Sequence, residues 1–245
     1  MSDQPQCSAV QSGPSPANLR ATPILDHQHP ALFDLVSRLR REKLPDRQLL
    51  RSAHRYLVHS VKPVYSLDEL QPASKTLQRG RGSCSQRMAC LEAVSRASDI
   101  PTRSRALQVS GQFWYPRFRP FRAFIPKRIL LVWPQFFLEG TWVDFDELYG
   151  TATELAERSE RAFSNDGESI FDAVDHTPID FLAKTCRSGC APSNFDLSRF
   201  VLVDEGFFNT RDEVFERFGS LHSTLRGQVF EVFYGDRSSL SAARS

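Results

Sequence analysis

A glycine-flanked cysteine introduces an apolar stretch in the first half of the chain. Residues 80–86 read GRGSCSQ and lead into apolar residues at helical spacing. Ser83, with Gln86 three positions later, matches the S-x-x-Q capping box, which predicts that a helix begins at Cys84. The helix field and the free N–H groups at that position favour thiolate over thiol, and they could hold an oxyanion. The segment therefore predicts a reactive thiolate at Cys84.

The other cysteines carry no comparable signal. A free cysteine is more often a small buried apolar residue than a reactive one, and Cys90, inside the expected helix among apolar neighbours, fits that interpretation. Cys186 and Cys190 are spaced C-x-x-x-C and offer two ligands where a structural zinc needs four. We therefore expect no metal site and no cofactor.

The composition is that of a folded protein with no one-sided charge. Of 245 residues, 40% are hydrophobic and 24% are charged, and 31 Lys and Arg against 29 Asp and Glu give a net charge of +2. These values exclude an intrinsically disordered chain and do not favour a nucleic-acid partner. The longest uninterrupted apolar stretch, near 129–133, is too short to span a membrane. With an odd number of cysteines and no secretory signal in residues 1–10, we expect a soluble cytoplasmic protein that binds no membrane.

The chain divides into a core with flanking segments. Apolar residues recur at helical spacing over 32–39 and again over 50–61, which predicts two antiparallel helices. The first residues are rich in Ser, Pro and Gln and cannot bury enough apolar surface to offset chain entropy. The expected divisions are a disordered tail over 1–25, a core over 26–150, a helical extension packed on the core over 151–234, and a second disordered tail over 235–245.

Strands are expected in the middle of the chain. Residues 104–110 and 129–145 are rich in aromatic and β-branched residues, and Glu139-Gly140 marks a tight turn within the second segment. This pattern is typical of a β-hairpin. We therefore expect a central, antiparallel sheet.

Three blocks of this sequence resemble the core of transglutaminase-like proteins. They are GSC at 82–84, RASDIPTR at 96–103 and VWPQFFLEGTWVDFD at 132–146. The match covers about residues 65–150. The resemblance implies an α+β fold of the papain-like type, with the helix that carries Cys84 packed against an antiparallel sheet. It also implies that Cys84 is the nucleophile and that Asp146 is the orienting carboxylate.

Two positions depart from the family pattern: Asp99 stands where the family usually has a glycine, and the catalytic histidine is replaced. Two residues before Trp133, where the family has its catalytic histidine, the chain has Leu131. With a two-residue turn between the strands, Trp133 faces Asp146, and Asp146 lies diagonal to Leu131. A histidine at position 131 would meet Asp146, but leucine cannot accept a proton. Because alternation places Asp144 on the same face, we expect Asp144 as a second catalytic carboxylate and Trp133 as a substrate contact.

His54 is the alternative base that the sequence leaves open. It falls on the apolar face of the helix expected over 50–61, so it points inward, where it could approach Cys84. A core histidine with satisfied hydrogen bonds is the more common state of such a residue.

A basic, aromatic segment over 113–122 offers candidate substrate contacts. It places Arg117, Arg119 and Arg122 between aromatic residues, at a point between core strands where an insertion could overhang Cys84. Arginines and aromatic rings suit an acidic substrate, a phosphopantetheine arm or nucleic acid. An ordinary solvated loop anchored by its aromatic residues is the equal alternative.

Two functions follow from these observations. In the first, Cys84 attacks an activated acyl group carried by a small molecule, a peptide or a carrier, and the resulting thioester is resolved by a second substrate or water. An activated donor is required because the histidine is missing. In the second, the protein is a catalytically inactive relative that serves as a binding or scaffold module. Its contact surface would then be the basic segment, facing an acidic protein, or the Phe-rich C-terminal third.

Overall fold

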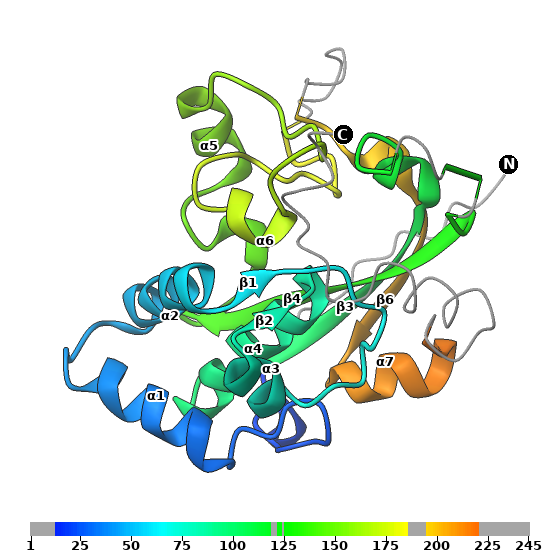
Figure 1. The fold of residues 1–245 in the computed structure, drawn as a ribbon. Helices are drawn as coiled ribbons and strands as arrows, with labels where there is room; N and C mark the ends of the chain where they lie inside the picture. Colours follow the sequence, from blue (N-terminus) through cyan, green and yellow to red (C-terminus); the bar gives the residue numbers. More distant parts are fainter. Residues whose placement is uncertain (1–12, 119–121, 124, 186–194, 221–245) are drawn as a thin grey trace, which may run out of the picture.

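The chain folds into an α+β arrangement in which helices pack on both sides of a curved antiparallel sheet (Figure 1). The computed structural model describes residues 13–118, 122–123, 125–185 and 195–220. In Figure 1, α3, α4 and α7 lie on one side of the long strands, whereas α5 and α6 lie on the other. The predicted fold class is therefore confirmed.

Four helices form the N-terminal half of the molecule. They are α1 (Pro30–Arg40), α2 (Asp46–Ser60), α3 (Ala73–Arg79) and α4 (Cys84–Ala97). The first two confirm the helices expected from hydrophobic spacing. All of the others pack against α4, which also contacts the sheet and buries Met88, Leu91 and Val94 in the main core. The helix that begins at Cys84 is thus the central helix of the fold.

The sheet has the strand order β5-β4-β3-β6, and each neighbouring pair is antiparallel. The strands are β3 (Thr102–Ser110), β4 (Arg128–Leu138), β5 (Thr141–Asp144) and β6 (Val201–Phe208). Glu139 and Gly140 connect β4 to β5 with positive φ angles of 53° and 79°, as a tight two-residue turn requires. The expected pairing of Gln135 with Asp144 is confirmed.

The C-terminal part of the described chain is less helical than expected. It contains the short helices α5 (Ala152–Arg158), α6 (Ile170–Ala173) and α7 (Arg211–Phe218). It also contributes β6, which pairs with β3 at the edge of the sheet. The residues of β6 are mainly aliphatic and aromatic, as strands favour, and Gly206, at a φ of 84°, lies where the register shifts. Such a bulge lets an edge strand follow a twisted neighbour.

The N-terminal segment over 13–25, which the sequence places in a disordered tail, packs on the core. Ile24 and Leu25 are buried, and the Arg96 guanidinium donates to the backbone carbonyl of Arg20 at 2.6 Å. Residues 1–12 and the expected tail over 235–245 lie outside the described residues. Searching the described parts of the chain for a long, apolar helix that could cross a membrane finds none.

Candidate functional site

The α4 N-terminus has the local structure that the sequence predicts. Ser83 caps the helix: its hydroxyl accepts from the backbone N–H of Gln86 at 3.3 Å, and the Gln86 side-chain oxygen accepts from the Ser83 N–H at 2.9 Å. Cys84 is the first helical residue, and its side chain is half-buried. A Cβ at position 82 would come within 2.6 Å of the Thr76 side chain. Gly82 is therefore needed for the close approach of α3 to this turn.

A loop lies against the same turn. The short strands β1 (Lys62–Pro63) and β2 (Arg81–Gly82) pair in parallel, and the Val64 N–H donates to the Gly82 carbonyl at 3.1 Å. On the other side of Cys84, the Gln86 side-chain amide donates to the Asp68 carbonyl at 2.7 Å. Gln86, the partner of Ser83 in the capping box, therefore also fixes the loop that follows β1.

Arg87, one helical turn after Cys84, is a buried cation. Its guanidinium pairs with Asp172 at 2.5 Å, donates to Ser169 at 3.2 Å, and lies 4.4 Å from the centre of the Phe171 ring. Within the described residues, its Nε–H has no hydrogen-bond partner. Side chains three positions apart share a helix face, so this donor lies on the face of α4 that carries Cys84.

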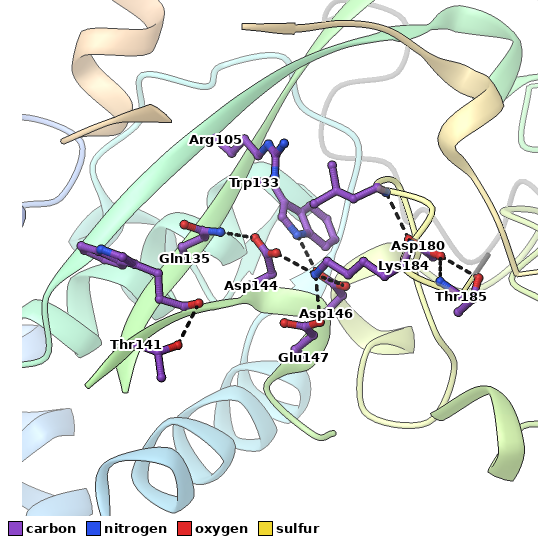
Figure 2. Close-up of polar contacts among 12 residues, drawn as sticks. Arg105, Trp133, Gln135, Thr141, Asp144, Asp146, Glu147, Asp180, Lys184 and Thr185 are labelled. Carbon is purple, nitrogen blue, oxygen red and sulfur yellow. Dashed lines mark hydrogen bonds and ion pairs between the residues drawn. The ribbon is translucent and has the colours of Figure 1, made fainter. Parts of the chain in front are cut away.

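The two candidate carboxylates gather at the end of β5, as expected (Figure 2). Gln135 donates to Asp144 at 2.6 Å, and the Trp133 indole N–H donates to Asp146 at 2.9 Å. The backbone ladder stops at Asp144, because the chain turns into a short 3-10 helix over Phe145–Glu147. The side chains of Trp133 and Asp146 nonetheless meet.

Lys184 is the unexpected member of this cluster. Its ammonium group lies 2.6 Å from Asp144, 3.1 Å from Asp146 and 3.2 Å from Glu147 (Figure 2). The buried Asp180 positions it, since the Asp180 carboxylate accepts from the backbone N–H groups of Lys184 and Thr185 at 2.9 and 2.7 Å. An aspartate that binds N–H groups a few residues ahead is a local turn signal. The sequence carries no signal that brings Lys184 to a strand 40 residues away.

Burial and charge shift the protonation equilibria of this cluster. Burial raises the pKa of Asp146, Lys184 and the Trp133 N–H oppose the shift, and the neighbouring Asp144 supports it, so that the pKa is about 7. Although burial favours the neutral amine, the three carboxylates raise the pKa of Lys184 above its usual value. Lys184 therefore stays charged, and Asp146 is the carboxyl that can hold a proton near neutral pH.

Aromatic rings connect the carboxylate cluster to the first turn of α4. The Phe171 ring under Arg87 lies 5.6 Å from Phe145, and Phe145 lies 5.5 Å from Trp133, which binds Asp146. In the described part of the structure, no hydrogen bond joins Cys84 to either aspartate. Leu131 is 8% exposed and pairs with Leu107 of β3.

His54 is a satisfied core histidine. It is fully buried, its Nε2–H donates to the Phe171 carbonyl at 2.6 Å, and its Nδ1 lies 2.8 Å from the Tyr149 hydroxyl. Burial lowers the pKa of His54 to about 4. The more common interpretation of the two is therefore confirmed. Cys90 is likewise buried, and burial raises the pKa of its thiol to about 12.

Two of the residues expected to contact substrate, Trp133 and Arg117, are buried. Trp133 is 1% exposed and packs between Phe145 and Phe181. Arg117 is also buried, and its guanidinium donates to Asn165 and to the Glu168 carbonyl. These side chains hold the core and a loop rather than lining open space.

The other predicted residues add little to the site. Arg122 is exposed, with its guanidinium 5.6 Å from the centre of the Tyr115 ring. Arg119, Cys186 and Cys190 lie outside the described residues. Among the residues that the structure describes, no group of His, Cys, Asp or Glu side chains is arranged to hold a metal ion.

Comparison with known proteins gives one family match, which lies over the core. Residues 34–147 match the family model of the transglutaminase-like superfamily. A search of curated proteins and a search of solved structures found no match.

Proposed function

Because residues 34–147 form a transglutaminase-like core, we propose that this protein is a cysteine-dependent acyltransferase or hydrolase in which Cys84 is the nucleophile. One observation carries the proposal: a half-buried cysteine is the first residue of a capped helix, where backbone N–H groups are free. Those groups and the helix field stabilise both a thiolate and the oxyanion of a tetrahedral intermediate. The buried Arg87 Nε–H, unpartnered in the described structure, belongs to the same helix three positions after Cys84.

The reaction has two steps. The Cys84 sulfur forms a bond to the acyl carbon while the bond from that carbon to the leaving group breaks, which leaves a thioester on the protein. An amine or water then attacks the thioester, and the sulfur departs as thiolate. The substrate is an activated acyl donor, because Leu131 stands where the family has its histidine and Asp146 already binds Trp133 and Lys184.

A second candidate function is a binding module without catalysis. The observation that favours it is the ion pairing of Lys184 with Asp144 and Asp146, which places a charged ammonium at the carboxylate expected to orient a histidine. In that case the partner would be an acidic protein or peptide.

Selective alkylation tests the first function. Iodoacetamide at pH 7, followed by peptide mass spectrometry, gives the rate at each cysteine, and the buried Cys90 is an internal control. We expect Cys84 to react at least about tenfold faster than an unperturbed thiol such as glutathione. A Cys84 rate no faster than that of glutathione would favour the binding module.

Acyl-enzyme formation tests whether Cys84 is the nucleophile. With p-nitrophenyl acetate, we expect a burst of one equivalent of p-nitrophenolate and an acetyl group on Cys84. Cys84→Ser should abolish the burst without changing the unfolding transition. A burst that persists in Cys84→Ser contradicts the assignment of the nucleophile.

A further inference from the structure

Tyr65 lies in a loop that is hydrogen-bonded to the turn of Cys84, although 19 positions separate the two residues in sequence. Its neighbours on either side are tied to the turn that carries the cysteine. The Val64 N–H donates to the Gly82 carbonyl at 3.1 Å, and the Gln86 amide donates to the Ser66 hydroxyl at 3.3 Å. These links lie two residues to either side of Cys84 and hold the loop that carries Tyr65 against the turn of the cysteine.

The Tyr65 side chain is fixed by the loop that contains the basic, aromatic segment. Its ring lies 4.8 Å from the ring of Phe118, and its phenol oxygen accepts a hydrogen bond from Arg117. Arg117 is in turn held by Asn165, whose side-chain oxygen accepts from Nε at 3.1 Å, and by the Glu168 carbonyl. These contacts hold the phenol in place.

Electrostatics agree with this placement. Burial raises the pKa of Tyr65, the Arg117 guanidinium opposes the shift, and the charge of Cys84 adds to it. The charge of Cys84 therefore reaches the phenol. At neutral pH the phenol keeps its proton and can donate it.

His54, Lys184 and Asp146 are committed to different partners. Both nitrogens of His54 are engaged in the core, and Lys184 is bound by three carboxylates. Asp146 binds Trp133 and connects to the α4 turn only through a series of aromatic contacts.

We propose that Tyr65 is the proton-transfer residue of the Cys84 site and that Arg117 is its positioning residue. This inference rests on the proposed function of Cys84. It extends the substrate class to acyl donors whose leaving groups must be protonated as they depart.

The proton balance of the two steps is complete. As the sulfur bonds to the acyl carbon, the leaving group departs with the Tyr65 proton, and the tyrosinate lies beside the Arg117 guanidinium. In the second step, water or an amine bonds to the acyl carbon and gives its proton to the tyrosinate. The sulfur leaves as thiolate, and the site returns to its starting state.

A leaving-group series tests the role of Tyr65. Acylation of Cys84 is measured with p-nitrophenyl, phenyl and p-methoxyphenyl acetate, whose phenolates are increasingly basic. In Tyr65→Phe, we expect p-nitrophenyl acetate to react within about threefold of the wild-type rate, and p-methoxyphenyl acetate to slow by about 100-fold or more. Tyr56→Phe, the same chemical change on α2, is the matched control and should alter none of the three rates.

The outcomes separate this inference from the proposed function. If Tyr65→Phe slows all three esters equally, or none of them, Tyr65 does not transfer the proton and the inference is wrong. In either case a burst on Cys84 still supports the proposed function. If wild-type Cys84 is neither alkylated rapidly nor acylated by any ester, both proposals are wrong.

The pH profile of acylation tests the positioning role of Arg117, because a purely structural role would not shift it. Because its charge favours the tyrosinate, Arg117→Gln should move the alkaline limb of the pH profile for p-methoxyphenyl acetate to higher pH. An unmoved limb in a folded variant contradicts the positioning role.

Discussion

At the scale of single residues, burial decides which titratable groups can react. His54 and Cys84 both lie on helices of the core, but the histidine is fully buried between Phe171 and Tyr149, whereas the thiol is half-exposed. The low pKa of His54 also makes stability depend on pH. Between pH 6.5 and about 4, the unfolded chain takes up a proton that the folded chain rejects, so stability is lost as the pH falls.

The first prediction concerns His54→Gln. At pH 7 the variant should lose about 1–3 kcal/mol of unfolding free energy, because glutamine does not reproduce the two buried hydrogen bonds of the His54 ring. In wild type, the protonation of His54 on unfolding lowers the unfolding free energy by roughly 3 kcal/mol between pH 6.5 and 4. The variant should lack this pH dependence. Urea unfolding of both proteins at pH 7, 6 and 5 measures the difference. A constant gap across that range would contradict the buried neutral state of His54.

Asp146 contributes a pH dependence of the opposite sign. Its folded pKa of about 7 lies above the ordinary value, so the folded chain binds the extra proton and this contribution to stability is lost as the pH rises through 7. In Asp146→Asn, which stays neutral, we expect stability to change less than in wild type between pH 6 and 8. Urea unfolding at pH 6, 7 and 8 gives both slopes, and equal slopes would mean that Asp146 does not titrate in this range.

At the scale of elements, one buried arginine joins α7, α4 and β4. Arg211 at the start of α7 pairs with Glu92 of α4, and both side chains are fully buried. It also donates to the Ser85 hydroxyl at 3.1 Å and to the Val132 carbonyl of β4 at 2.9 Å. Ser85 follows Cys84 directly, so this arginine ties the turn that carries the cysteine to the strand that carries Leu131.

Replacing Arg211 should reveal the cost of an unpaired buried charge. We expect Arg211→Met to destabilise the protein by about 3–5 kcal/mol, because Glu92 is left buried without its partner. The double variant Arg211→Met/Glu92→Met should recover most of that loss. Urea unfolding of the wild type, the single variant and the double variant is the measurement. A double variant no more stable than the single one would show that the hydrogen bonds to Ser85 and Val132, rather than the charge pair, dominate.

At the scale of the whole molecule, the N-terminal segment closes the fold. The Asn18 side-chain amide donates to the Thr102 carbonyl at 3.1 Å, and the Thr22 hydroxyl donates to Asp212 of α7 at 2.5 Å. Ile24 and Leu25 lie in a core cluster with Val214 and Phe215. Segments about 190 residues apart in sequence are therefore neighbours in space.

Truncation tests this closure. Removing residues 1–25 should lower the unfolding free energy by about 3–6 kcal/mol relative to removing residues 1–12, because two buried aliphatic side chains are lost. Thermal or urea unfolding of the two truncated proteins measures the difference. Equal stability would contradict the packing of residues 13–25.

The sequence alone determined the features that depend on neighbours along the chain. The capping box placed the start of α4 at Cys84, and the Glu139-Gly140 turn set the register that pairs Gln135 with Asp144. Both follow from local hydrogen bonding and from backbone angles that few residues adopt.

Tertiary structure decided what depends on burial and on contacts between distant segments. It brought Lys184 to Asp144, β6 to β3, and Tyr65 to the turn of Cys84. It also made His54 a neutral core residue rather than a base. No local pattern specifies these outcomes, because the energy of a buried charge or an edge strand depends on which remote groups exclude water and complete its hydrogen bonds.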